Sequence, residues 1–134
     1  MRGALGNSMN SAIDDISEDY QDWGLDNLSY KDGLLTLNLV TYIKGDDPIR
    51  FIVVFTDTVF FESYDESSHF QDYHLNRSSG VIGVYTASSL LEYAKTKTNV
   101  MCLSNDKLSH YSVMTTNEII HVLTRTEPVV VNVT

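Results

Sequence analysis

The chain has 134 residues, of which 43% are hydrophobic and 20% are charged. This composition predicts one soluble globular domain and excludes a disordered chain, and no apolar run is long enough for a transmembrane helix. Its 18 acidic and nine basic residues give a net charge of −9, and its single cysteine excludes an intrachain disulfide.

The negative charge is concentrated in one half of the chain. Residues 1–72 contain 14 of the acidic and four of the basic residues, a net charge of −10, whereas residues 73–134 have a net charge of +1. A field of this sign repels nucleic acid and anionic membranes and attracts cationic surfaces from a distance. We therefore expect a cationic protein partner, no nucleic-acid partner and no membrane partner.

The predicted organisation is a single α+β domain over residues 9–134, preceded by a disordered tail or cloning remnant over residues 1–8. The N-terminal residues lack the apolar segment of a secretory signal, so a cytoplasmic location is expected. A helix is predicted after Ser11, because apolar residues recur at helical spacing at Ile13, Ile16, Tyr20 and Trp23. Asp19 and Asp22 lie late in this segment, away from the helix end that favours acids, and are candidate partner-binding residues.

Beyond Leu25 the hydrophobic period changes to two, which indicates strands. Residues 34–43 and 49–61 are predicted to form a long antiparallel hairpin, whose second strand is central because both its faces are apolar. Further strands are predicted over 81–86, 109–115, 119–124 and the terminal VVVNV. Residues 62–79 are polar and are interpreted as a loop, with room for one irregular strand. A capping box of Ser89 and Glu92 predicts a helix over 89–97. The expected fold class is α+β, mainly an antiparallel sheet with one N-terminal helix and the helix near 89–97 packed on it.

The sequence contains no recognised catalytic motif, and we expect no enzyme, no cofactor and no metal. His69 and His74 lie near carboxylates, but a spacing of five on an irregular loop does not match known metal-ligand patterns. His110 and His121 alternate with apolar residues in a predicted hairpin, which favours structural roles for both.

Residues 60–74, FFESYDESSHFQDYH, interleave carboxylates with aromatic side chains. Such a segment is suited to cationic surfaces, because carboxylates accept charge-assisted hydrogen bonds and aromatic rings bind cations. The alternative interpretation is that the aromatic residues face the core and the acids face water. The candidate partner-binding residues here are Glu62, Tyr64, Asp65, Glu66, Asp72 and Tyr73.

Three segments resemble small bacterial immunity proteins of polymorphic-toxin and contact-dependent growth inhibition systems. The segments are FTDTVFFESYDESS, VYTASSLLEYAKT and LSHYSVMTTNEIIHVLTRTEPVV, and the resemblance spans roughly residues 50–131. It implies an antitoxin that neutralises a cognate toxin in the cytoplasm by one-to-one binding, and many such toxins are basic nucleases. The β-rich pattern departs from the all-helical immunity proteins of colicin DNases, so no toxin contact carries over from those.

Two other functions remain open at the level of sequence. A self-associating scaffold or regulatory module, such as a homodimer, would use the edge that VVVNV offers. A metal-dependent enzyme would be centred on His69 and His74.

Overall fold

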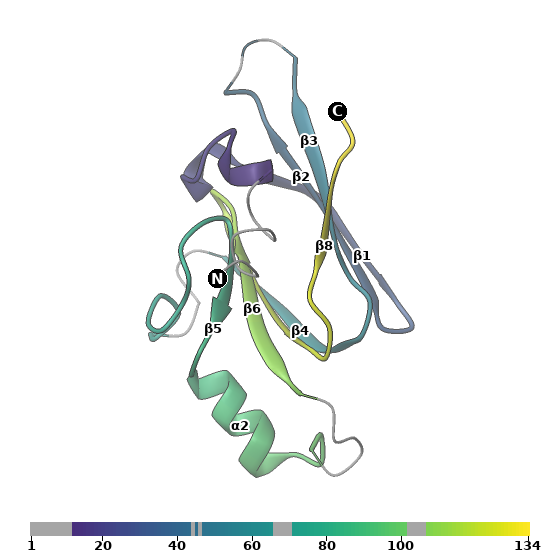
Figure 1. Cartoon of the computed structure of the whole chain (residues 1–134), viewed down its shortest axis with the longest axis vertical. Helices are drawn as coiled ribbons and strands as arrows, with labels where there is room; N and C mark the ends of the chain where they lie inside the picture. The colour runs from purple at the N-terminus through teal and green to yellow at the C-terminus, as the bar shows by residue number, and fades with distance from the viewer. Residues whose placement is uncertain (1–11, 44, 46, 66–70, 102–106) are drawn as a thin grey trace.

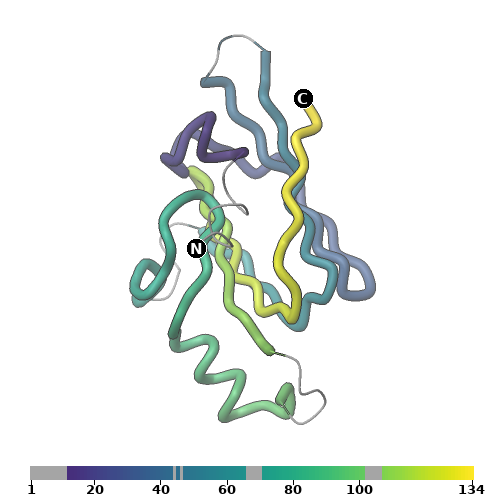
Figure 2. Tube along the Cα trace, viewed as in Figure 1, coloured from purple at the N-terminus to yellow at the C-terminus, as the bar shows by residue number. Residues whose placement is uncertain are grey.

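The computed structural model describes residues 12–43, 45, 47–65, 71–101 and 107–134, and within them two four-stranded antiparallel sheets. The first sheet has the order β1-β2-β3-β8, with bounds Gly24–Lys31, Leu34–Thr41, Ile49–Phe55 and Val129–Asn132. The second has the order β4-β7-β6-β5, with bounds Thr58–Asp65, Glu118–Thr124, Ser109–Met114 and Ile82–Tyr85. Helix α2, Ser89–Lys97, lies at one end of the second sheet, and the C-terminal strand β8 runs beside β3 (Figures 1 and 2).

The two sheets share one hydrophobic core. In β2 the residues alternate strictly, so Leu35, Leu37 and Leu39 are buried while their neighbours are partly exposed. The second sheet contributes Tyr111 and other apolar residues of its inner face, and the Tyr111 ring lies 5.8 Å from the ring of Phe55 in β3. This architecture confirms the predicted α+β fold with mainly antiparallel strands.

The predicted hairpin of residues 34–43 and 49–61 is present as β2 and β3, with Leu37 opposite Val53. The apolar run 49–61, however, forms two strands instead of one. The chain bends at Thr56 and Asp57, and β3 and β4 lie in different sheets. β3 is internal to its sheet, as predicted, whereas β4 is an edge strand and extends to Asp65, into the segment expected to be a loop.

The N-terminal segment is less helical than its apolar spacing predicts. Helical residues 12–14 are followed by turns and by the 3₁₀ helix η1, Tyr20–Asp22, before β1 begins. Side-chain capping interrupts the helix, because Ser17 Oγ accepts from the Asp19 backbone N–H and Asp19 caps η1. Trp23 still reaches the core, packing edge-on against Phe51 with ring centroids 5.7 Å apart.

Helix α2 has the bounds that the sequence predicts, but its cap is one residue earlier than expected. Ser88 is the N-cap and accepts from the Leu91 backbone N–H at 3.0 Å. Leu90, Leu91 and Ala94 bury the inner face of the helix in a second, smaller apolar cluster. The predicted tail over residues 1–8 lies outside the described residues.

Candidate functional site

Several acidic side chains lie at one end of the sandwich. The backbone N–H of Thr116, in the β6–β7 turn, donates to the Trp23 carbonyl at 2.8 Å, which fixes the N-terminal segment beside that turn (Figure 1). Asp65, at the end of β4, is the register partner of Glu118 in β7. We call this group the acidic end, and its members are Asp15, Glu18, Asp19, Asp22, Asp65 and Glu118.

The charges of the N-terminal segment are not neutralised locally. Among the residues that the structure describes, no lysine or arginine lies within ion-pair distance of Asp15, Glu18, Asp19 or Asp22. Burial, and to a lesser extent the nearby carboxylates of Glu18 and Asp15, raise the pKa of Asp14, while the Val81 backbone N–H and the charge of Arg77 partly offset the rise. The negative potential of this segment is therefore available to a partner.

Of the acids predicted here to bind a partner, Asp19 and Asp22 also stabilise their own segment. Asp19 is exposed and its carboxylate accepts from the Gln21 backbone N–H at 2.9 Å. Asp22 is half-buried and accepts from the Ser17 hydroxyl at 2.5 Å. Both can contribute charge to a partner, but replacing either residue also removes a local hydrogen bond.

The other predicted site residues do not all lie at the acidic end. Asp65 belongs to the acidic end, whereas Glu62 lies further back along β4, half-buried, and accepts from the Tyr64 hydroxyl. Burial raises the pKa of the Glu62 carboxyl. Glu66 lies outside the described residues.

Asp72 and Tyr73 meet the start of helix α2 and the second sheet. The Asp72 carboxylate accepts from the Ser89 backbone N–H and the Ser89 hydroxyl, both at 3.0 Å. Burial alone would raise the pKa of Asp72, but these hydrogen bonds outweigh it and the pKa is lowered. The Tyr73 carbonyl accepts from the Tyr85 hydroxyl. Both residues thus attach the segment after residue 70 to the body of the domain.

Sequence reasoning missed a buried polar network on the outer face of the second sheet. His110 and His121 are fully buried, as structural residues, with His110 Nε2 2.9 Å from His121 Nδ1. The Ser88 hydroxyl accepts from the Leu91 N–H and is hydrogen-bonded to His110 Nδ1, 2.6 Å away. Each ring nitrogen of His110 therefore has a hydrogen-bonding partner, Ser88 Oγ at Nδ1 and His121 Nδ1 at Nε2.

Arg77 is the cation of this network. Its guanidinium donates five hydrogen bonds, to the Ser112 hydroxyl and to the carbonyls of Ser78, Gly80, Val81 and Ser112. The guanidinium lies directly over Gly83, where an added Cβ would come within 2.3 Å of Arg77 Cζ. Arg77 therefore fastens residues 77–81 to β5 and β6, and the absence of a side chain at Gly83 in VIGVYT is the one sequence feature that points to it.

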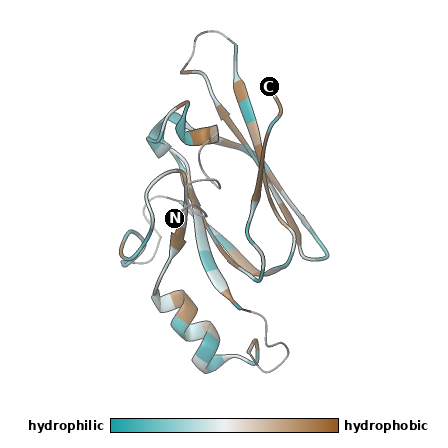
Figure 3. Ribbon diagram, viewed as in Figure 1, coloured by the Kyte–Doolittle hydropathy of each residue, from teal (hydrophilic) through white to brown (hydrophobic). Residues whose placement is uncertain are grey.

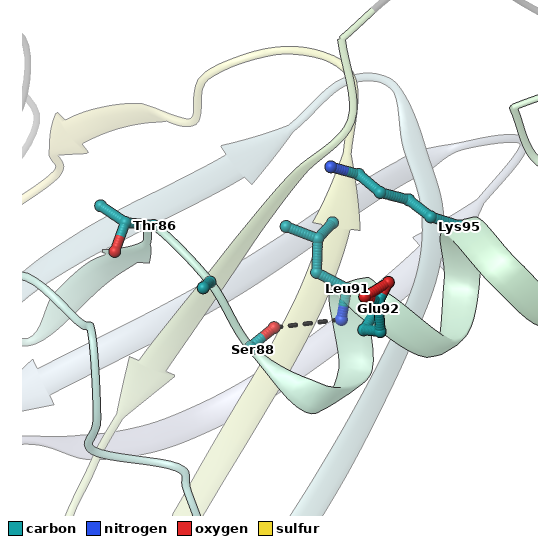
Figure 4. A pocket seen from close by; sticks show the side chains of 6 residues that line it. Thr86, Ser88, Leu91, Glu92 and Lys95 are labelled. Carbon is teal, nitrogen blue, oxygen red and sulfur yellow. Dashed lines mark hydrogen bonds between the residues drawn. The ribbon is translucent and has the colours of Figure 1, made fainter.

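The described residues contain no group of three or more histidine, cysteine or acidic side chains that could hold a metal ion. His74 is exposed with its ring 4.9 Å from the Tyr73 ring, and His69 lies outside the described residues. A pocket of about 130 Å³ at the start of α2 is lined by Thr86, Ser88, Glu92 and Lys95 among others (Figure 4). Its acid and its cation come from the same exposed helix face, so it presents no net charge to a ligand.

Across the part of the chain that the structure describes, no helix is long and apolar enough to cross a membrane. No protein-family model, curated protein or solved structure matches the chain.

Proposed function

We propose that this protein is an immunity protein that binds a cationic toxin through its acidic end and neutralises it in the cytoplasm. The observation that carries the proposal is the group of acidic side chains at one end of the sandwich, with no described cation within ion-pair distance of its four N-terminal members. The resemblance of residues 50–131 to immunity proteins of polymorphic-toxin systems agrees with this function.

The physical basis of the proposal is electrostatic complementarity. A concentrated charge accelerates the encounter with an oppositely charged protein and selects it over neutral ones. A basic nuclease toxin carries positive charge where it contacts nucleic acid, and an acidic inhibitor that covers this surface blocks the substrate.

The test is a growth assay in which the protein is co-expressed with the toxin domain encoded beside it. The wild type should restore growth. The double variant Asp15→Asn/Glu18→Gln should protect less well, because it removes two exposed charges whose side chains make no described hydrogen bond. Toxicity that the wild type does not relieve would refute the proposal.

The matched control removes two acids at the other end of the molecule. Asp32 and Asp57 lie in neighbouring turns, since the Thr58 N–H donates to the Gly33 carbonyl at 3.0 Å. Asn tolerates the positive φ of 53° at position 32, so Asp32→Asn/Asp57→Asn changes the net charge equally without backbone strain. This variant should protect as well as the wild type, and equal loss in both variants would contradict a localised site.

Self-association is a second candidate function, favoured by the edge strand β8. Val129, Val131 and Val133 are 53%, 44% and 44% exposed, and β8 is mostly apolar in Figure 3. Val131→Lys on this edge should abolish a dimer measured by sedimentation while leaving the fold intact. A wild-type chain that stays monomeric at all concentrations would exclude this candidate.

A further inference from the structure

A groove separates edge strand β4 from helix α2. It has a volume of about 430 Å³ and is lined by Phe60 and Glu62 of β4 and by Ser89, Leu90 and Tyr93 of α2. A wholly apolar hollow of about 70 Å³ adjoins it, shares Phe60, Leu90 and Tyr93, and is also lined by Leu123. The groove is thus apolar along one part and carries a carboxyl group in another.

The walls and the base of the groove differ in exposure. Leu90 and Leu123 are buried, at 6% and 3% exposure, and belong to the same apolar cluster. Phe60 and Tyr93, from β4 and α2, are 38% and 57% exposed. Two exposed aromatic rings beside a buried aliphatic base suit a long side chain that is apolar along its stem.

The polar part of the groove is negative. Tyr64 donates to Glu62 Oε2, and an ionised carboxylate can accept several further hydrogen bonds. A second carboxylate, that of Asp72, is bound to Ser89, which also lines the groove. The raised pKa of Glu62 reflects burial without a compensating cation among its causes, so a cation bound beside it would relieve that cost.

We propose that this groove binds an arginine side chain of the cationic partner, with its stem between Phe60 and Tyr93 and its guanidinium on Glu62. This inference rests on the proposed function, because it names the residue type by which the toxin would be recognised. Arginine fits the groove better than lysine, since its planar head stacks on aromatic rings and donates two parallel hydrogen bonds to one carboxylate.

The experiment titrates the full chain with acetylated, amidated Gly-Arg-Gly and follows the backbone amide resonances of β4 and α2 by NMR. The peptide should shift the resonances of Phe60, Leu90 and Tyr93, whereas the same peptide with neutral citrulline in place of arginine should not. Shifts confined to residues 15–22 would overturn the proposal, because they would report only general attraction to the acidic end.

Two variants and a control test the assigned contacts. Glu62→Gln removes the charge at nearly constant shape and should weaken binding by ~10-fold or more. Glu92→Gln removes one exposed acid from the same helix, outside the groove, and should change affinity less than ~2-fold. Equal weakening by both variants would overturn the proposal.

If Glu62→Gln fails to fold, Tyr93→Ala provides a second test of the groove. Tyr93 is exposed on α2, so its truncation leaves the core intact and should weaken the arginine peptide several-fold. Unchanged affinity in a folded Tyr93→Ala would overturn the assignment of the groove wall.

These outcomes are separable from those of the proposed function. If the protein binds the arginine peptide in the groove but does not protect against the toxin, the arginine site is supported and the proposed function is refuted. If the wild type and Glu62→Gln protect equally well, the proposed function is supported and the arginine site is refuted.

Discussion

His110 lies in the interior beside the ring of Tyr85, which stacks on it at 3.9 Å, and beside His121. Burial, and after it the neighbouring His121 ring, lower the pKa of His110 to about 3. In the neutral ring both nitrogens have partners, Ser88 Oγ at Nδ1 and His121 Nδ1 at Nε2. Protonation would place a positive charge on a buried ring beside the His121 ring.

This geometry predicts a loss of stability in mild acid. The unfolded chain binds a proton at His110 near pH 6.5, whereas the folded chain does so only near pH 3, so folding is favoured by this residue above pH 6.5 and progressively less below it. The free energy of unfolding should fall by about 1.4 kcal/mol per pH unit in that window from this one group.

Urea unfolding from pH 7 to pH 4 measures the slope. His110→Gln should lower stability at pH 7 and flatten the pH dependence, whereas His74→Gln, at an exposed position, should leave the slope of the wild type unchanged. A His110→Gln slope equal to that of the wild type would mean that other groups cause the acid sensitivity.

At the scale of the elements, the segment that carries Arg77 is attached to strands β5 and β6 by hydrogen bonds. Met114 N–H donates to the Val81 carbonyl at 2.9 Å, and Arg77 forms an isolated bridge with Tyr85. The side-chain hydrogen bonds of Arg77 add to these and cover carbonyls that would otherwise be buried beside the outer face of the sheet. Gly83 leaves the space that the guanidinium fills.

Substitution of Gly83 tests this attachment. Gly83→Ala should cost about 2–3 kcal/mol, because the new methyl group displaces the guanidinium and leaves its carbonyl partners unpaired. Gly24→Ala in β1 is the control: its Cβ would meet nothing nearer than 3.9 Å, so the change should stay within about 0.5 kcal/mol. Thermal or urea unfolding of the two variants compares them directly, and equal costs would contradict the role of Arg77.

Elements set by nearby residues were predictable from the sequence. The β2–β3 hairpin follows from alternating apolar residues, and helix α2 from serine capping and a short apolar stripe. The bend at Thr56 and Asp57 was not predictable, because the apolar run continues on both sides and only the transfer from one sheet to the other requires the break. The same limit applies to the site: Asp72 meets Ser89, and Glu62 faces α2, through tertiary contacts that no local pattern encodes.

The whole molecule separates its charge from its apolar surface. Acidic side chains gather where the N-terminal segment meets the β6–β7 turn, while exposed Val129 and Val131 lie on β8 in the other sheet, followed by exposed Val133. A chain of net charge −9 repels its own copies, so association with itself and association with a cationic partner respond to salt in opposite directions. Salt dependence therefore distinguishes the two candidate functions at the scale of the molecule.

The most direct measurement of the proposed function is the rate of association with the proposed cationic toxin, followed by stopped-flow fluorescence of Trp23 or of a labelled toxin. Between about 50 and about 300 mM salt the rate constant should fall by ~10-fold or more. Asp15→Asn/Glu18→Gln should lower the rate and its salt dependence, and Asp32→Asn/Asp57→Asn should not. A rate that is independent of salt, or reduced equally by both pairs of substitutions, would contradict binding through the acidic end.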